Sequence, residues 1–190
     1  MFNALIFLFC SFSFINPPSV SYEYHSKKAD YFFHHGNYPE MLYHLSEKVK
    51  LEPKDVETWS DLAYYYWSMS VDNKKRRDEF KTKALSYLER GLDKNPESSF
   101  MWDELGRFYL YNDKKYEKAI GYFEQALLRK DCNNITYHLL ALCYEKVYRN
   151  NDAIKILKEC MSKFPNDMRA KSKLESLNNS ESKKNKLNGA

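Results

Sequence analysis

The chain has 190 residues, of which 43% are hydrophobic and 29% are charged, and its formal net charge is +4 at pH 7. This composition is typical of a folded protein, and the length suits one domain or one short repeat array. Six basic and two acidic residues lie between 169 and 190, so basic and acidic side chains balance over 22–168. Since nucleic-acid-binding domains usually carry a basic face on the folded body, we expect no nucleic-acid partner.

The first 21 residues carry no Asp, Glu, Lys or Arg, and residues 2–15 form the apolar run FNALIFLFCSFSFI. As a helix this run is about 21 Å long, which is shorter than the hydrocarbon core of a bilayer. Two prolines follow it, and small residues precede Tyr22. We therefore predict a secretory signal peptide over 1–21, and an exported protein, periplasmic or extracellular, with no stable membrane span after cleavage.

Two alternatives stay open for this N-terminal segment. Because no Lys or Arg precedes the apolar run, the segment could instead remain as an uncleaved membrane anchor. Cys10 raises the alternative of lipidation, although Leu8 and Phe9 before it are bulky where a lipoprotein signal is expected to have small residues.

The stretch from Trp102 to Leu127, WDELGRFYLYNDKKYEKAIGYFEQAL, contains the clearest motif of the chain. Trp102, Leu105, Gly106 and Tyr109 lie on one helical face, and Ala119, Phe123 and Ala126 lie on a second helix after a short polar turn. The motif resembles the tetratricopeptide repeat, whose signature is W-x2-L-G-x2-Y, then A-x3-F, then a closing proline. This resemblance implies an all-α solenoid of stacked antiparallel helix pairs that acts by binding.

The same motif recurs in register along the chain. Pro53 lies six residues before Trp59, and Pro96 lies six residues before Trp102, so each proline closes one repeat just ahead of the next. The register predicts four repeats over about 22–55, 56–98, 99–133 and 134–167. We expect a capping helix over 168–177, begun by Asp167, and a disordered basic tail over 178–190.

Two repeats are longer than the pattern between their helices. The pattern has about 16 residues between these positions, whereas Trp59 and Ala84 are 25 residues apart and Trp102 and Ala119 are 17 residues apart. The extra residues of the second repeat fall around 72–81, where we expect Asp72 to cap a lengthened second helix and KKRR to be exposed. The role of this insertion stays open between a solvated extension and a contact with an acidic partner or membrane surface.

The family resemblance also implies which residues line the inner groove, because fixed positions of each first helix face it. In this chain those positions include acidic and aromatic residues, which makes the N-terminal half of the groove unsuited to a peptide carboxylate. We therefore predict a protein or peptide partner with a basic or amphipathic segment, while the acids could instead merely solvate that face. The predicted groove residues are Asp30, Glu57, Asp61, Tyr64, Trp67, Phe100, Asp103, Glu104, Arg107, Tyr111 and His138.

No motif for catalysis, nucleotide binding or metal binding is recognisable. Histidines cluster early, at His25, His34, His35 and His44, without a cysteine or carboxylate at metal-ligand spacing. We therefore expect no enzyme activity, no cofactor and no metal. Cys160 falls at a small-residue packing position and Cys143 lies on a first helix, so we expect both as buried thiols, with a disulfide between them as the alternative.

Two functions are consistent with these patterns. The first is a protein-interaction scaffold that binds a peptide or helical segment in its groove. The alternative is a structural or assembly subunit of a cell-envelope complex that acts through its outer face and basic tail.

Overall fold

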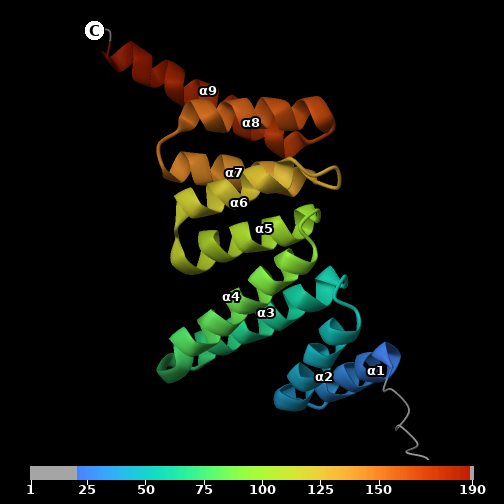
Figure 1. Ribbon diagram of the computed structural model, residues 1–190. Helices are drawn as coiled ribbons and strands as arrows, with labels where there is room; N and C mark the ends of the chain where they lie inside the picture. Colours follow the sequence, from blue (N-terminus) through green and yellow to red (C-terminus); the bar gives the residue numbers. More distant parts are fainter. Residues whose placement is uncertain (1–20, 189–190) are drawn as a thin grey trace, which may run out of the picture.

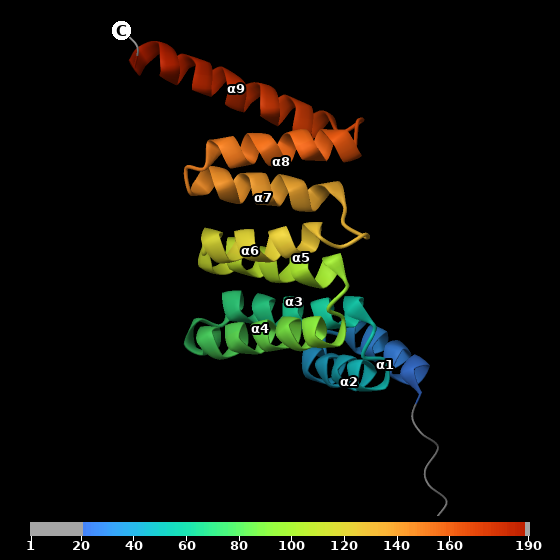
Figure 2. The same cartoon turned by 45° about the horizontal axis from the view of Figure 1, so that its top comes forward.

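The structure, a computed structural model, describes residues 21–188. Within that range the chain is all-α and forms four antiparallel helix pairs followed by one last helix (Figures 1 and 2). The fold is an α-solenoid, as the sequence predicted. The first helices of the pairs are α1 (Tyr22–His34), α3 (Val56–Asp72), α5 (Ser99–Phe108) and α7 (Asn134–Lys146), and the second helices are α2 (Tyr38–Leu51), α4 (Arg77–Lys94), α6 (Tyr116–Leu127) and α8 (Asn150–Lys163), with α9 (Met168–Asn188) at the end.

The α3–α4, α5–α6 and α7–α8 pairs and α9 are stacked in that order, whereas the α1–α2 pair is set to one side of the stack (Figure 2). Each helix buries one face against the other helix of its pair and another against a neighbouring pair. A single hydrophobic core therefore runs through the stack. Its fully buried members include Leu62, Leu105, Phe123, Tyr137 and Leu157, which come from every pair after the first.

Polar residues placed before the helices explain where most of them begin. The side chains of Ser21, Asp55 and Ser98 accept hydrogen bonds from backbone N–H groups in the first turns of α1, α3 and α5. Asp167 does the same for α9, where its Oδ1 accepts from Ala170 N at 3.0 Å, as the sequence predicted. These contacts satisfy N–H groups that have no partner within the helix.

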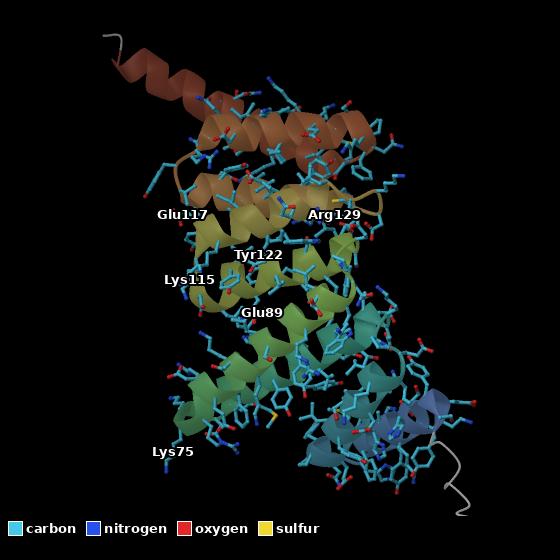
Figure 3. The ribbon with its side chains drawn as sticks, in the orientation of Figure 1. Lys75, Glu89, Lys115, Glu117, Tyr122 and Arg129 are labelled. Carbon is cyan, nitrogen blue, oxygen red and sulfur yellow. The ribbon has the colours of Figure 1, made fainter. Side chains whose placement is uncertain are left out.

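The spacing of six residues between proline and tryptophan has a physical reason. The indole Nε1 of Trp59 donates to the carbonyl oxygen of Pro53 at 3.0 Å, and that of Trp102 donates to the carbonyl of Pro96 at 2.8 Å. Each carbonyl also accepts from a residue just after the following second helix: Asn95 Nδ2 at 2.9 Å for Pro53, and Arg129 Nε at 3.3 Å for Pro96. Arg129 is labelled at the end of α6 in Figure 3. Tryptophan and proline therefore tie successive repeats together.

The insertion of the second repeat lengthens both of its helices. α3 has 17 residues and α4 has 18, and a short 3₁₀ turn over Lys74–Arg76 joins them. The prediction that Asp72 caps the second helix was wrong: Asp72 is the last residue of α3, and Asn73 caps the turn by accepting from Arg76 N at 3.2 Å. Lys75 extends from the free end of this hairpin in Figure 3.

All four basic residues of KKRR are exposed, as predicted, and two of them have partners. Arg76 donates to both carboxylate oxygens of Glu79, at 2.8 and 2.7 Å, and its guanidinium lies over the ring of Phe80. Arg77 donates to the carbonyl of Ser70 at 3.4 Å. These side chains therefore brace the hairpin tip.

The third repeat takes up its one extra residue differently, by a π-helical turn over Tyr109–Asp113 at the end of α5. A π turn accommodates one residue more than the α-helix it interrupts. Lys114, with φ of 51°, then reverses the chain, and Asp113 pairs with Lys81 of α4. The turn thus places the end of α5 against the second repeat.

The last helix extends beyond its predicted end. We expected a cap over 168–177 and a disordered tail from 178, but α9 runs from Met168 to Asn188. No glycine or proline stands between Pro165 and Gly189, so nothing in the sequence stops the helix earlier. In the part of the chain that the structure describes, no helix is both long and apolar enough to cross a membrane. The predicted signal peptide over 1–21 falls, except for Ser21, outside the described residues.

The turn between α7 and α8 carries a conformation that favours glycine. Tyr148 has φ of 60° and its side chain is 93% exposed, so no packing offsets the unfavourable backbone geometry. We expect Tyr148→Gly to raise the free energy of unfolding by about 0.5–1 kcal/mol. Urea denaturation of the two proteins tests this, and an unchanged or lower midpoint would contradict it.

Asp55 holds the first pair to the second. Its Oδ2 accepts from the hydroxyl of Tyr22 at 2.6 Å and lies 3.7 Å from Nζ of Lys48, while Oδ1 accepts from Thr58 N at 3.1 Å. Burial raises the pKa of Asp55, but these hydrogen bonds and the lysine charge outweigh it and leave the pKa below its usual value. The charged carboxylate is therefore the form that joins α1, α2 and α3.

We expect Asp55→Ala to lower the free energy of unfolding by about 1–3 kcal/mol at pH 7, since a cap is lost and the side chains of Tyr22, Lys48 and Thr58 each lose a partner. Because the folded pKa lies below the unfolded one, this stabilisation is complete above the unfolded pKa and is lost as the pH falls through the folded value. The difference between wild type and Asp55→Ala should thus shrink below about pH 4. Chemical denaturation across the pH range measures it, and a difference that grows with acid would refute the assignment.

Candidate functional site: the groove of the first helices

A hollow of about 200 Å³ lies between the second and third helix pairs. It is formed mainly by the first helices α3 and α5, on the side predicted to be the inner groove. Its walls are mainly aromatic and apolar, and Glu104, Arg107 and Asn112 add polar side chains. The lining residues are Ala63, Tyr64, Trp67, Leu88, Glu104, Arg107, Phe108, Tyr111 and Asn112, which include five of the predicted groove residues.

The charges beside this hollow are largely paired with one another. Arg107 Nε donates to Asp103 and lies 3.5 Å from Oε1 of Glu104. Asp103 is only 5% exposed, and its Oδ1 also accepts from the hydroxyl of Thr136 at 2.8 Å. The prediction of Asp103 as a groove contact is therefore not supported by its position: it is buried beneath the surface and links α5 to α7.

Glu104 has a different environment from Asp103. Its Oε2 accepts from the hydroxyl of Ser60 at 2.9 Å, which joins the second and third pairs. Burial raises the pKa of Glu104, although Ser60 and Arg107 act in the opposite direction. Because burial disfavours the charged form of Glu104, an additional cation from a ligand would stabilise that form.

A second hollow of about 510 Å³ lies between α7, α8, α9 and the π turn that follows α5, and it shares Tyr111 with the first. Tyr111 is 58% exposed, so its ring stands between the two hollows without being needed in the core. The lining residues are Tyr111, His138, Leu139, Ala141, Leu142, Glu145, Leu157, Arg169, Ser172, Lys173 and Ser176.

Sequence reasoning missed the α9 part of this wall, because we treated α9 as a solvating cap. A signal for it was present. Arg169, Ser172, Lys173 and Ser176 lie 34 residues after the groove-side positions of α7, which is the period of the repeat. The same register continued past Pro165 identifies them. Arg169 and Lys173 bring basic side chains to this end of the groove, where Nζ of Lys173 is paired with Oε2 of Glu145 at 2.8 Å.

The remaining predicted residues lie outside both hollows. Phe100 and the acidic side chains Glu57 and Asp61 are exposed on the first helices of their pairs, and Asp30 is exposed on α1, 3.3 Å from Nε2 of His34. The groove side of α1 and α3 therefore carries acidic side chains, whereas that of α9 carries basic ones.

The histidines do not form one site. His25 and His44 contact each other through Nδ1 atoms at 2.8 Å in the interior of the first pair, while His34 is exposed. His138, predicted as a groove contact, has a side chain only 10% exposed, and its Nε2 lies 2.8 Å from Oδ2 of Asp167. Among described residues, Cys143 and Cys160 are both buried free thiols, and burial raises the pKa of each to about 12.

Comparison with known proteins supports the fold. Residues 102–134 match the family model described as a tetratricopeptide repeat. No curated protein sequence matches the chain. A solved structure of MamA from Desulfovibrio magneticus is 17% identical, with 85% of each chain covered and a TM-score of 0.60.

Two further solved structures are similar. A thermophilic TPR protein of Thermus thermophilus is 19% identical, with 83% of this chain and 81% of that chain covered and a TM-score of 0.61. PilW, described as a widely conserved type IV pilus biogenesis factor, is 18% identical, with 82% and 68% covered and a TM-score of 0.59. At such identities the likeness shows the fold.

Proposed function

We infer, from a helical stack that contains a tetratricopeptide repeat and is hollowed along its first helices, that this chain is a non-enzymatic scaffold for a protein partner. Tetratricopeptide-type folds are typically non-catalytic and bind proteins. The observation that carries the proposal is the first hollow, where Tyr64, Trp67 and Tyr111 surround a space large enough for one aromatic or branched side chain.

The charges along the groove define the segment that fits it. Glu104 and Asp61 lie on one side of Tyr111, and Arg169 and Lys173 lie on the other. The partner segment is therefore amphipathic: it places an apolar anchor in the first hollow, a basic group near Glu104 and an acidic group near α9. Complementary charge of this kind fixes the orientation of a bound segment.

Selection of peptides from a displayed random library tests this proposal with the full chain as bait. We expect the selected peptides to share an apolar residue flanked on one side by Lys or Arg. Trp67→Ala should lose them, and Glu104→Lys should select against the basic flank. Peptides that bind wild type and Trp67→Ala equally would overturn the proposal, because the first hollow would then not be the site.

A third hollow supports the alternative of an assembly subunit that uses its outer face. It has a volume of about 330 Å³ and is formed mainly by the second helices α2 and α4. Leu42, Tyr43, Tyr66, Phe80 and Tyr87 are among its lining residues. A partner bound there would be lost in Tyr43→Ala and kept in Trp67→Ala, which is the opposite of the result expected for the groove.

Export of the chain remains part of the proposal. The uncharged apolar run over 2–15 supports it, and cleavage would leave Tyr22 as the first residue, at the start of α1. Mass determination of the protein recovered from cells distinguishes the alternatives. A mass that begins at Tyr22 supports secretion, whereas a full-length mass in the membrane fraction supports an anchor.

A further inference from the structure

Three side chains of different ligand types converge where α7, α8 and α9 meet. They are His138 from α7, Cys160 from α8 and Asp167 from the turn before α9, and their donor atoms all lie within 4.8 Å of one another. Oδ2 of Asp167 is the common neighbour, at 2.8 Å from Nε2 of His138 and 3.6 Å from Sγ of Cys160. Spacing along the sequence does not reveal this cluster, because its members are 22 and 7 residues apart.

We propose that this cluster is a binding site for a divalent zinc-type cation. Imidazole, thiolate and carboxylate are the three protein ligands that zinc takes, and a thiolate disfavours calcium and magnesium. With ordinary zinc bond lengths, ligands at tetrahedral angles are separated by about 3.3 Å for nitrogen and oxygen and about 3.5 Å for sulfur and oxygen. The sulfur–oxygen distance already fits, and the nitrogen–oxygen distance needs to widen by about 0.5 Å.

The surroundings orient the carboxylate and give the ion a route. Nδ2 of Asn134 donates to the same Oδ2 at 2.8 Å and so fixes the carboxylate, while three protein ligands leave the fourth zinc position to water. His138 lines the groove hollow beside α9, whereas Asn134 and Asp167 line a separate hollow of about 400 Å³. The cluster is thus enclosed, with side chains of Asp167 and His138 only 5% and 10% exposed, yet it borders solvent on two sides.

A cation here would fasten the last helix to the stack. Asp167 keeps its other oxygen on the N–H of Ala170, so the cap of α9 and the metal bond use different atoms. The ion would join three helices that otherwise meet through packing and hydrogen bonds, and it would fix the wall that carries Arg169 and Lys173. The site does not depend on the identity of any groove ligand.

Titration of Co²⁺ into the reduced full-length chain tests the proposal, because a tetrahedral cobalt–thiolate site absorbs in the visible and near ultraviolet. We expect one bound ion per chain, displaced by Zn²⁺. Cys160→Ser should remove the thiolate absorption, and His138→Gln should weaken binding by at least about 10-fold. Cys143→Ser is the matched control, since Cys143 is also fully buried but lies outside the cluster.

Two further measurements keep the test decisive. Circular dichroism of Cys160→Ser without metal should match wild type, and Zn²⁺ should raise the melting temperature of wild type and of Cys143→Ser but not of Cys160→Ser. Absence of a thiolate band in the wild-type chain, or the same band in Cys160→Ser, would overturn the proposal. A band lost in Cys132→Ser but kept in Cys160→Ser would also overturn it, by assigning the ion to the half-exposed Cys132.

Discussion

Replacing Gly106 with alanine is expected to lower the free energy of unfolding by about 1–3 kcal/mol. A Cβ atom on Gly106 would come within 2.5–2.8 Å of three ring atoms of Phe123. The Phe123 ring is fully buried and packs between α5 and α6, so it has no free space to enter. The two helices must then separate, and the larger Gly106→Leu should cost more. Chemical denaturation measures both.

Gly121→Ala provides a matched control in the same repeat. Gly121 lies inside α6, and an added Cβ would meet no atom within 4 Å. The only expected effect is the higher helix propensity of alanine, which raises the free energy of unfolding by about 0.5–1 kcal/mol. Glycine to alanine is thus expected to change the free energy of unfolding in opposite directions at Gly106 and Gly121. A change in the same direction at both positions would refute the assigned packing of α5 on α6.

Replacing Tyr111 with alanine is expected to weaken binding of a groove-selected peptide by about 30-fold or more, equivalent to roughly 2 kcal/mol. The ring of Tyr111 lines both groove hollows. Its removal therefore takes away part of the wall that a bound peptide would contact in each. Because this side chain is 58% exposed, the stability of the fold should change little. Isothermal titration calorimetry with one selected peptide measures the affinity.

Tyr148→Ala is the control for an exposed tyrosine outside the groove. Tyr148 lies in the turn between α7 and α8 and lines none of the described hollows. Its replacement should leave the affinity of the same peptide unchanged. An equal loss of affinity in both variants would mean that the peptide does not recognise the groove.

The periodic features of this fold were predictable because each is set by local sequence. The proline, tryptophan and small residues recur at fixed spacing, and each spacing corresponds to a contact: Trp102 with the carbonyl of Pro96, or Gly106 against Phe123. The register of the repeats also pointed to five residues that line one hollow. Helix periodicity determines which face a residue lies on, and in a repeat fold the face determines the neighbours.

The features that could not be predicted depend on how deeply a side chain is buried and on partners that are far away in the sequence. Register places Asp103 and Glu104 on the same side of α5, but only packing against Thr136 of α7 buries Asp103. The insertion contains residues that suit either helix, so the sequence did not show that it lengthens both. The meeting of His138 with Cys160 and Asp167 is a tertiary contact, which spacing along the chain does not show.

Photo-crosslinking of a selected peptide, followed by mapping of the adducts by mass spectrometry, tests the central claim most directly. With the photoreactive group at the apolar anchor, the account predicts adducts on α3 and on the end of α5, at residues around Trp67 and Tyr111. Adducts on α2 and α4, around Tyr43 and Phe80, would contradict it and assign the partner to the outer face.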